Sequence, residues 1–325
     1  MSNTEARPAA VMCRRGPGTG AAAVEVLEPR SVPLGGVRAM PVRRTLPQRT
    51  RSLIGAWCFV DHYGPDDVAV TGGMRVPPHP HTGLQTVSWL FSGELEHRDS
   101  LGTVAPVRPG QLNLMTAGHG ICHSELSTPD TSVLHGVQLW IALPDAHRDT
   151  PGDFQHYEPE PVDLGGVTVR VFLGSLGGRR APVPTFTPLL GAELTLPPSA
   201  RLTLDLDPAF EHGVLADTGE VDVAGTPCSG GQLGYLEPGV EQLTLVNPGP
   251  EPGRVILLGG TPLGEDLVMW WNFVGRSHEE IARFRDEWQA GSERFGQVDG
   301  YPGDRLPAPD LPATRLVPRR DQRHR

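Results

Sequence analysis

The chain has 325 residues, enough for two domains of ordinary size, and 38% of them are hydrophobic. The formal net charge of -10 argues against the basic surface that nucleic-acid phosphates and anionic membranes attract, so we expect neither as a direct partner. No run approaches the roughly 20 apolar residues of a membrane span, and no apolar core of a signal peptide follows the first Met. We therefore expect a cytoplasmic protein.

The first part of the chain predicts a flexible lead followed by an all-β domain. Residues 1–21 have no periodic apolar pattern and are expected to be flexible. Residues 22–145 contain short apolar runs, such as 84–93 and 133–144, separated by turns rich in Gly and Pro. Short strands without intervening helices are typical of sandwiches and barrels.

A second β-rich block of similar size follows. Residues 146–165 are polar and rich in Pro, which indicates a linker, and residues 166–298 again contain short β-type runs such as VTVRVFLGS and RVILLGG. This block has no His-x-His motif, and its isolated His212 is expected to be a surface or structural residue. We predict a second barrel without metal that packs on the first.

One helix is predicted near the C-terminus, over residues 278–290. Ser277 is a good N-cap, and Glu280, three residues later, completes a capping box. Three apolar side chains then fall on one helix face, and Gly291 ends the helix. The remaining residues, 299–325, are rich in Pro and Arg and are expected to form a disordered tail.

Two pairs of candidate metal ligands share one spacing. His79 and His81 lie two residues apart in PPHPHTG, as do His123 and Glu125 in GICHSE. In a strand, residues i and i+2 point to the same face, so two neighbouring strands would bring these four side chains together. Three imidazoles and a carboxylate suit Fe, Mn, Co, Ni, Cu or Zn. Structural histidines explain the spacing equally well, because chance pairs are common among 12 His.

The sequence around these residues resembles the pirin family. HPHTGLQTVSWLFSGELEHRDSLG and RPGQLNLMTAGHGICHSE look like the N-terminal barrel of pirins, as do FVDHYGP and QLWIALP, so the resemblance covers most of residues 50–145. It implies two packed cupin barrels of the double-stranded β-helix, or jelly-roll, type. It also implies one divalent transition metal in the first barrel, with Fe2+ expected ahead of Mn, Ni, Co, Cu or Zn. The implied ligands are His79, His81, His123 and Glu125.

Several nearby residues depart from the family pattern or lie close to the implied ligands. Gln85 stands where pirins usually have Glu, which removes a negative charge, and His119 stands where human-type pirins carry Arg, which we expect to change access or partner choice. Cys122 is adjacent to a ligand but should point to the opposite face of its strand. His62 and His97 are interpreted as supporting residues for the ligands.

The resemblance leaves more than one function open. Some pirins resemble quercetinases, so the first expectation is a dioxygenase acting on a small aromatic flavonol, with Glu125 also serving as general base. Phe59, Trp89 and Leu114 are candidates for the pocket wall, although each is a core residue by default. The alternative is a metal- or redox-dependent regulatory protein that binds a transcription factor or a metabolic enzyme. A third possibility is an isomerase or hydrolase with a small polar substrate. We expect a monomer.

Overall fold

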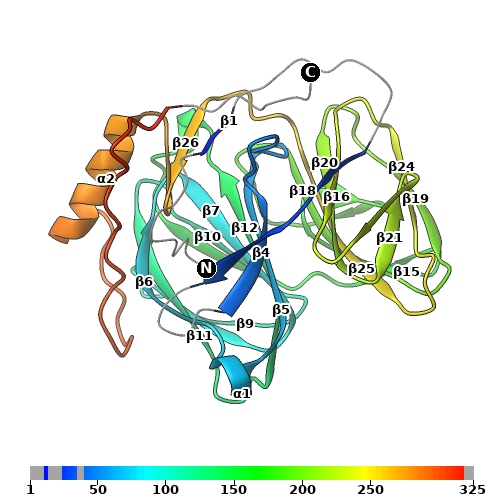
Figure 1. Ribbon diagram of the computed structural model, residues 1–325, viewed down its shortest axis with the longest axis horizontal. Helices are drawn as coiled ribbons and strands as arrows, with labels where there is room; N and C mark the ends of the chain where they lie inside the picture. Colours follow the sequence, from blue (N-terminus) through cyan, green and yellow to red (C-terminus); the bar gives the residue numbers. More distant parts are fainter. Residues whose placement is uncertain (1–10, 14–23, 35–39, 318–325) are drawn as a thin grey trace.

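The computed structural model describes residues 11–13, 24–34 and 40–317, and it arranges them as two β-barrels lying side by side (Figure 1). The first barrel, mostly blue to green, lies between the orange helix α2 (His278–Ala290) and the yellow-green second barrel. The expected all-β architecture of two packed barrels is therefore confirmed.

The first barrel combines a seven-stranded and a four-stranded antiparallel sheet. The larger sheet has the order β13-β10-β7-β12-β5-β4-β3, and the smaller sheet has the order β6-β11-β8-β9. The strands of this barrel are β3 (Arg30–Leu34), β4 (Met40–Leu46), β5 (Trp57–Asp67), β6 (Arg75–His81), β7 (Leu84–Ser92), β8 (Leu95–Asp99), β9 (Val104–Val107), β10 (Leu112–Thr116), β11 (Ile121–Ser127), β12 (Val133–Ala142) and β13 (Asp153–Tyr157).

The second barrel repeats this plan. Its larger sheet has the order β14-β15-β18-β25-β20-β23-β2, its smaller sheet is β19-β24-β21-β22, and β16 pairs with β17. The strands are β2 (Glu25–Leu27), β14 (Val162–Leu164), β15 (Val167–Leu173), β16 (Ser175–Leu176), β17 (Arg179–Arg180), β18 (Leu189–Leu196), β19 (Arg201–Asp205), β20 (Glu211–Thr218), β21 (Glu220–Val223), β22 (Thr226–Ser229), β23 (Leu233–Leu236), β24 (Gln242–Val246) and β25 (Gly253–Gly260).

A small sheet and three short or isolated helical elements complete the fold. The sheet consists of β1 (Val11–Cys13), β26 (Leu267–Trp270) and β27 (Phe273–Gly275). The helical elements are α1 (Val68–Thr71), a 3₁₀ turn (Asp145–His147) and α2, which has the predicted bounds. In α2, the Ser277 side chain accepts a hydrogen bond from the Glu280 N–H, so the predicted N-cap is confirmed. Neither α-helix has the length and apolarity that crossing a bilayer requires.

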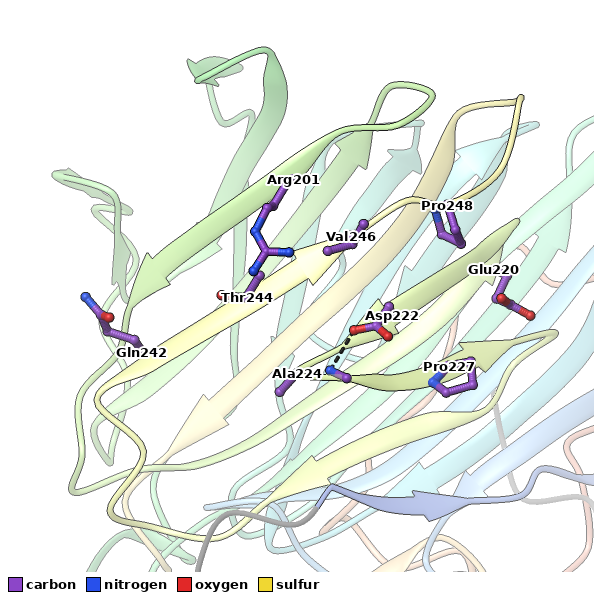
Figure 2. Close-up of a pocket in the computed structure, with 10 residues that line it drawn as sticks. Arg201, Glu220, Asp222, Ala224, Pro227, Gln242, Thr244, Val246 and Pro248 are labelled. Atoms are coloured by element: carbon purple, nitrogen blue, oxygen red, sulfur yellow. Dashed lines mark hydrogen bonds between the residues drawn. The ribbon is translucent and has the colours of Figure 1, made fainter.

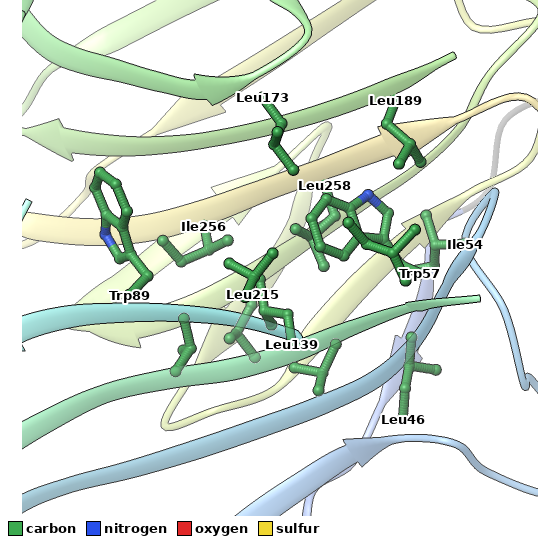
Figure 3. Packing of buried hydrophobic residues seen from close by; sticks show 14 of the residues in the cluster. Leu46, Ile54, Trp57, Trp89, Leu139, Leu173, Leu189, Leu215, Ile256 and Leu258 are labelled. Carbon is green, nitrogen blue, oxygen red and sulfur yellow. The ribbon is translucent and has the colours of Figure 1, made fainter. Parts of the chain in front are cut away.

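A large hydrophobic core joins the two barrels. It contains side chains from both, including Trp57 and Trp89 of the first and Leu215, Ile256 and Leu258 of the second (Figure 3). Strands at this interface are covered on both faces, because one face lines its own barrel and the other meets the partner barrel. That double burial explains why they read as near-continuous apolar runs instead of strictly alternating ones.

The predicted boundaries of the lead and the linker need correction. Within the predicted lead, residues 11–13 form β1, whereas the rest of that segment lies outside the described residues. β2, predicted in the first domain, instead pairs with β23 of the second barrel. The predicted linker contains β13 and β14, which pair with opposite barrels. These strands are short and mostly half-exposed or exposed, so their sequences lack the apolar pattern that marks a strand.

The C-terminal part of the predicted second domain packs on the first barrel. β27 contacts the end of β6 through a bridge between Phe273 and Thr82. Residues 299–317 of the predicted disordered tail are folded against α2, whereas residues 318–325 lie outside the described residues. Ala308 and Leu316 are buried in a cluster with side chains of α2, and the Trp288 indole donates to the Leu306 carbonyl at 2.8 Å. Apolar contacts with α2 thus outweigh the polar composition of this segment.

A buried polar network also crosses the barrel interface. His62 Nε2 and His135 Nε2 each lie 2.6 Å from the same Asp217 oxygen. Arg254 donates to the other Asp217 oxygen at 2.6 Å, and Arg43 donates to His62 Nδ1 at 3.3 Å. Burial lowers the pKa of His62. Burial alone would raise the pKa of Asp217, but hydrogen bonds from His135 and His62 hold it well below its ordinary value.

Both shifts make this interface sensitive to acid. The folded-state pKa of Asp217 is below the unfolded value of about 3.9, so its stabilisation is complete well above that pH and is lost as the pH falls further. The folded-state pKa of His62 is also lowered, so its contribution is present above about pH 6.5 and declines on acidification.

We predict that Asp217→Asn lowers the free energy of unfolding by about 3 kcal/mol at pH 7.5, because it removes the buried charge that pairs with half-buried Arg254. Urea denaturation at pH 7.5 and pH 3.5 would measure the free energy of unfolding of both proteins. The difference between the wild type and Asp217→Asn should be smaller at pH 3.5. Asp130→Asn, at an exposed position, is the matched control and should change stability by less than about 0.5 kcal/mol. Equal losses in the two variants would refute the role of the network.

Candidate metal centre

The four predicted ligands lie on two paired strands. β6 carries His79 and His81, and β11 carries His123 and Glu125. The strands are antiparallel, with His123 directly opposite His79 and a register shift before Glu125. All four side chains point into the first barrel and are fully buried, with 0% exposure. Strand pairing therefore places them in one water-excluded region.

Two of the imidazoles are held by backbone carbonyls. His79 Nδ1 donates to the Pro77 carbonyl at 2.8 Å, and His81 Nδ1 donates to the Asn272 carbonyl at 3.1 Å. A carbonyl oxygen only accepts, so the ring proton of each neutral imidazole is on Nδ1 and the lone pair is on Nε2.

The ligand atoms of the three imidazoles lie close together. His81 Nε2 lies 3.1 Å from His123 Nε2. The buried His79 Nε2 has no hydrogen-bond partner among the described residues. Nitrogen ligand atoms of His79, His81 and His123 all lie within 4.8 Å of one another. This donor set fits a transition-metal ion, which would satisfy all three nitrogens at once.

Burial keeps the three imidazoles neutral. It lowers the pKa of His81 to about 3. It also lowers the pKa values of His79 and His123 well below the ordinary value, and the proximity of the other imidazoles adds to the effect. At neutral pH the rings therefore present lone pairs without first losing a proton, which is the state that binds metal.

Glu125 follows His123 by two residues on β11. It forms a second potential ligand group with His123 and His97, and it does not belong to the three-histidine group. Ser88 Oγ is 3.1 Å from Glu125 Oε1 and 3.0 Å from Gln138 Oε1, so this hydroxyl can donate to either oxygen. The carboxylate is thus held beside the histidines by polar contacts of its own.

An aromatic wall borders the histidines. The His81 ring packs edge-on against Trp140, at a centroid distance of 5.1 Å. Trp140 in turn stacks on Phe59 at 4.0 Å. Of the three predicted wall residues, only Phe59 lies here. Trp89 and Leu114 face the core between the barrels, and the Trp89 indole donates to Glu193 of the second barrel.

The other residues singled out in the sequence lie away from the ligand group. Gln85 donates to Thr116 Oγ1 at 2.9 Å, and His119 is exposed. Cys122 points away from the histidines into the cluster that contains α2, and burial raises the pKa of its thiol to about 12. This thiol is therefore protonated at neutral pH and unsuited to reaction. Only His97, of the two predicted supporting histidines, contacts a candidate ligand.

A third group of potential ligands is less suited to a metal. His62, His135 and Asp217 converge at the barrel interface. Arg43 donates to His62 Nδ1, so the proton of the neutral ring is on Nε2, the atom that faces Asp217. Because that nitrogen has no free lone pair and Arg254 already pairs with the carboxylate, this group is a hydrogen-bonded interface network. No sequence pattern indicates this network, since it depends on how the barrels pack.

The second barrel contributes a surface groove of about 770 Å³ on the outer face of its smaller sheet (Figure 2). Arg201, Thr244 and Asp222 line it, and Asp222 accepts a hydrogen bond from the Gly225 N–H at 2.6 Å. None of the candidate metal ligands lines this groove. His212 is fully buried, which excludes the surface position left open by the sequence and leaves a structural role.

Comparison with known proteins agrees with this architecture. The pirin family model matches residues 38–141, and the model of the pirin C-terminal cupin domain matches residues 191–296. A Pseudomonas aeruginosa protein named "Putative quercetin 2,3-dioxygenase" is 46% identical over 314 residues, covering 96% of this chain and 98% of that protein. A pirin-like protein of Caulobacter vibrioides is 34% identical and covers 83% of this chain and 94% of its own length.

A solved structure supports the same assignment. The crystal structure of a quercetin 2,3-dioxygenase from Acinetobacter baumannii superposes with a TM-score of 0.86 at 36% identity, and the match covers 90% of this chain and 98% of that chain. The resemblance inferred from the sequence is therefore confirmed, and the chain, with its two cupin barrels, belongs to the pirin family.

Proposed function

We propose that the chain binds one divalent transition metal through the Nε2 atoms of His79, His81 and His123 and the carboxylate of Glu125. The observation that carries the proposal is the convergence of three buried imidazoles whose Nδ1 atoms are all occupied by other partners. Fe2+ is the proposed ion, by resemblance to the family. A solved Escherichia coli pirin is described as a complex with nickel(II), so Ni2+ is a suitable probe.

We further propose that the loaded protein is a dioxygenase that opens the ring of a flavonol such as quercetin. The Pseudomonas aeruginosa relative and the Acinetobacter baumannii structure described above carry that name. The bound metal would act as a Lewis acid that orients a phenolate oxygen and dioxygen. Dioxygen is itself the oxidant and enters the product, so no separate reductant is needed.

The side chains around the ligands have suitable roles for a planar polyphenol. Glu125 would accept the proton of the phenol, while Ser88 holds one of its carboxylate oxygens. The stacked pair of Phe59 and Trp140 offers an apolar edge beside His81. Trp140 Nε1 and Gln138 Nε2 are buried donors without a partner among the described residues, and hydroxyl or carbonyl oxygens of a polyphenol would satisfy them.

The second candidate is a metal- or redox-dependent regulatory protein that binds a protein partner. The observation that favours it is the complete burial of all four proposed ligands, because a closed site suits a metal that acts on the surrounding surface. For either function, a monomer in the cytoplasm is our proposal from composition and charge.

We predict that His81→Ala removes most of the metal. Loss of a direct ligand should weaken Ni2+ binding by at least about 100-fold, since even second-shell changes cost 10- to 100-fold. Mass spectrometry of metal content after desalting would show about one equivalent in the wild type. His147→Ala, at an exposed histidine, is the control and should retain the metal. Equal metal in the wild type and His81→Ala would exclude this site.

We predict that Glu125→Gln slows quercetin consumption by roughly 100-fold or more, because the amide cannot accept the phenol proton. The rate should be followed by flavonol absorbance and oxygen uptake, on samples adjusted to equal metal occupancy. Glu241→Gln, at an exposed position, should leave the rate unchanged. If fully loaded wild-type protein consumes no quercetin, the dioxygenase proposal fails and the regulatory one gains.

A further inference from the structure

A buried side-chain hydrogen-bond chain leads from Asp99 through His97 to His123. His97 Nε2 lies 3.1 Å from Asp99 Oδ2, and His97 Nδ1 lies 3.3 Å from His123 Nδ1. His97 and Asp99 are on β8, at alternating positions that point into the barrel, and both are 2% exposed. Ionisable groups are rarely buried unless they are paired, so this arrangement calls for a role.

We propose that Asp99 and His97 are positioning residues that fix the tautomer and the ring orientation in which His123 presents Nε2 to the metal. The inference rests on the metal-binding role proposed above for His123. It adds two residues that do not touch the ion.

The tautomers of His97 and His123 follow from the carboxylate of Asp99, which begins this series of hydrogen bonds and can only accept. A carboxylate only accepts hydrogen bonds, so His97 Nε2 must carry the proton that points at Asp99. The neutral His97 ring then has its lone pair on Nδ1, which accepts the proton on His123 Nδ1. This leaves the lone pair of His123 on Nε2, the atom that faces His81 Nε2.

Both positioning residues are themselves held in place. The other Asp99 oxygen, Oδ1, accepts hydrogen bonds from the N–H groups of Leu101 and Thr103, at 2.9 and 3.1 Å. The His97 ring packs against Phe154, with a centroid distance of 4.8 Å. The carboxylate therefore cannot readily turn away, and the imidazole cannot readily flip. The fold thus sets the direction in which the hydrogen bonds run from His123 through His97 to Asp99.

His123 is the one of the three candidate imidazoles whose Nδ1 depends on a side chain. Backbone carbonyls, which substitution does not remove, hold the Nδ1 atoms of His79 and His81. Side-chain substitutions can therefore reverse the tautomer of His123 while leaving the other two rings as they are.

A direct ligand role for His97 is the competing explanation, because His97, His123 and Glu125 also form a compact group. The two roles differ in what they require at position 97. If His97 bound the ion itself, replacing it with Gln would remove an imidazole ligand. If His97 acts through His123, a Gln oxygen that accepts the His123 Nδ1 proton would be sufficient.

Asp99→Asn tests whether the hydrogen-bond chain sets the tautomer of His123. Its amide oxygen can still accept the Leu101 and Thr103 N–H groups, but its NH₂ group now faces His97 Nε2. His97 must then accept there and carry its proton on Nδ1, which moves the proton of His123 to Nε2 and blocks the lone pair. We expect Ni2+ affinity to fall by about 10- to 100-fold in competition with a chromophoric chelator. Asp130→Asn is the matched control.

A second measurement does not depend on metal. Nitrogen-15 NMR of the metal-free protein should show the His123 proton on Nδ1 in the wild type and on Nε2 in Asp99→Asn. The thermal midpoints of the two metal-free proteins should agree within a few degrees. Wild-type affinity in Asp99→Asn, or an unchanged His123 tautomer, would overturn the proposal.

Substitutions of His97 cover the case in which Asp99→Asn does not fold. His97→Gln can offer an oxygen to His123 Nδ1–H and should keep Ni2+ affinity within a few-fold of the wild type, whereas His97→Phe should lose it. Equal losses in both would indicate a ligand and overturn the positioning role. Failure of the wild type to bind Ni2+ would instead reject the metal site itself, while the NMR result would still test the hydrogen-bond chain.

Discussion

The antiparallel pairing of β6 with β11 is the constraint on which the candidate site depends. It places His79 opposite His123, and directly opposed side chains in such a pair are about 5 Å apart at Cβ. Inside a closed barrel, that proximity removes water from the imidazoles and favours their neutral forms. Neutral rings whose Nδ1 atoms are already occupied have only Nε2 lone pairs to offer one another. A metal cation would satisfy these lone pairs best, so the register of the two strands is what makes the proposed metal site possible.

The remainder of the chain protects this pairing from both sides. The second barrel covers the outer faces of the strands that meet it, with Trp57 donating to the carbonyls of Leu190 and Gly259. On the other side, the C-terminal segment covers β6 and β11. Cys122 of β11 is buried among the aromatic side chains of that segment, and the Leu306 N–H donates to the Pro78 carbonyl at 2.8 Å, immediately before His79 on β6.

Local signals in the sequence were sufficient for some features. The i, i+2 spacing of the two candidate ligand pairs reflects strand geometry, and the N-cap contact of α2 joins Ser277 to Glu280, only three residues away, so both could be read from the chain. Features set by distant contacts could not. Trp89 was a plausible pocket residue until the structure paired its indole with Glu193 of the other barrel, and His62 looked like support for the ligands but faces Asp217. The C-terminal segment has a polar, Pro-rich composition, and only its contacts with α2 show why it is ordered.

The carbonyl of Asn272 makes the orientation of His81 depend on a residue that is synthesised much later than the candidate site. It holds the Nδ1 proton of His81 although it lies 191 positions further along the chain. The preceding residue, Trp271, has a φ of 54°, a conformation that is costly for a bulky side chain and that surrounding packing must maintain. On the ribosome, the strands that carry the histidines emerge long before this carbonyl does. The nascent first barrel therefore lacks one of its orienting contacts, and the fully oriented site forms only once the far end of the chain has folded back. The candidate site therefore becomes fully ordered only after the C-terminal segment has folded onto the first barrel.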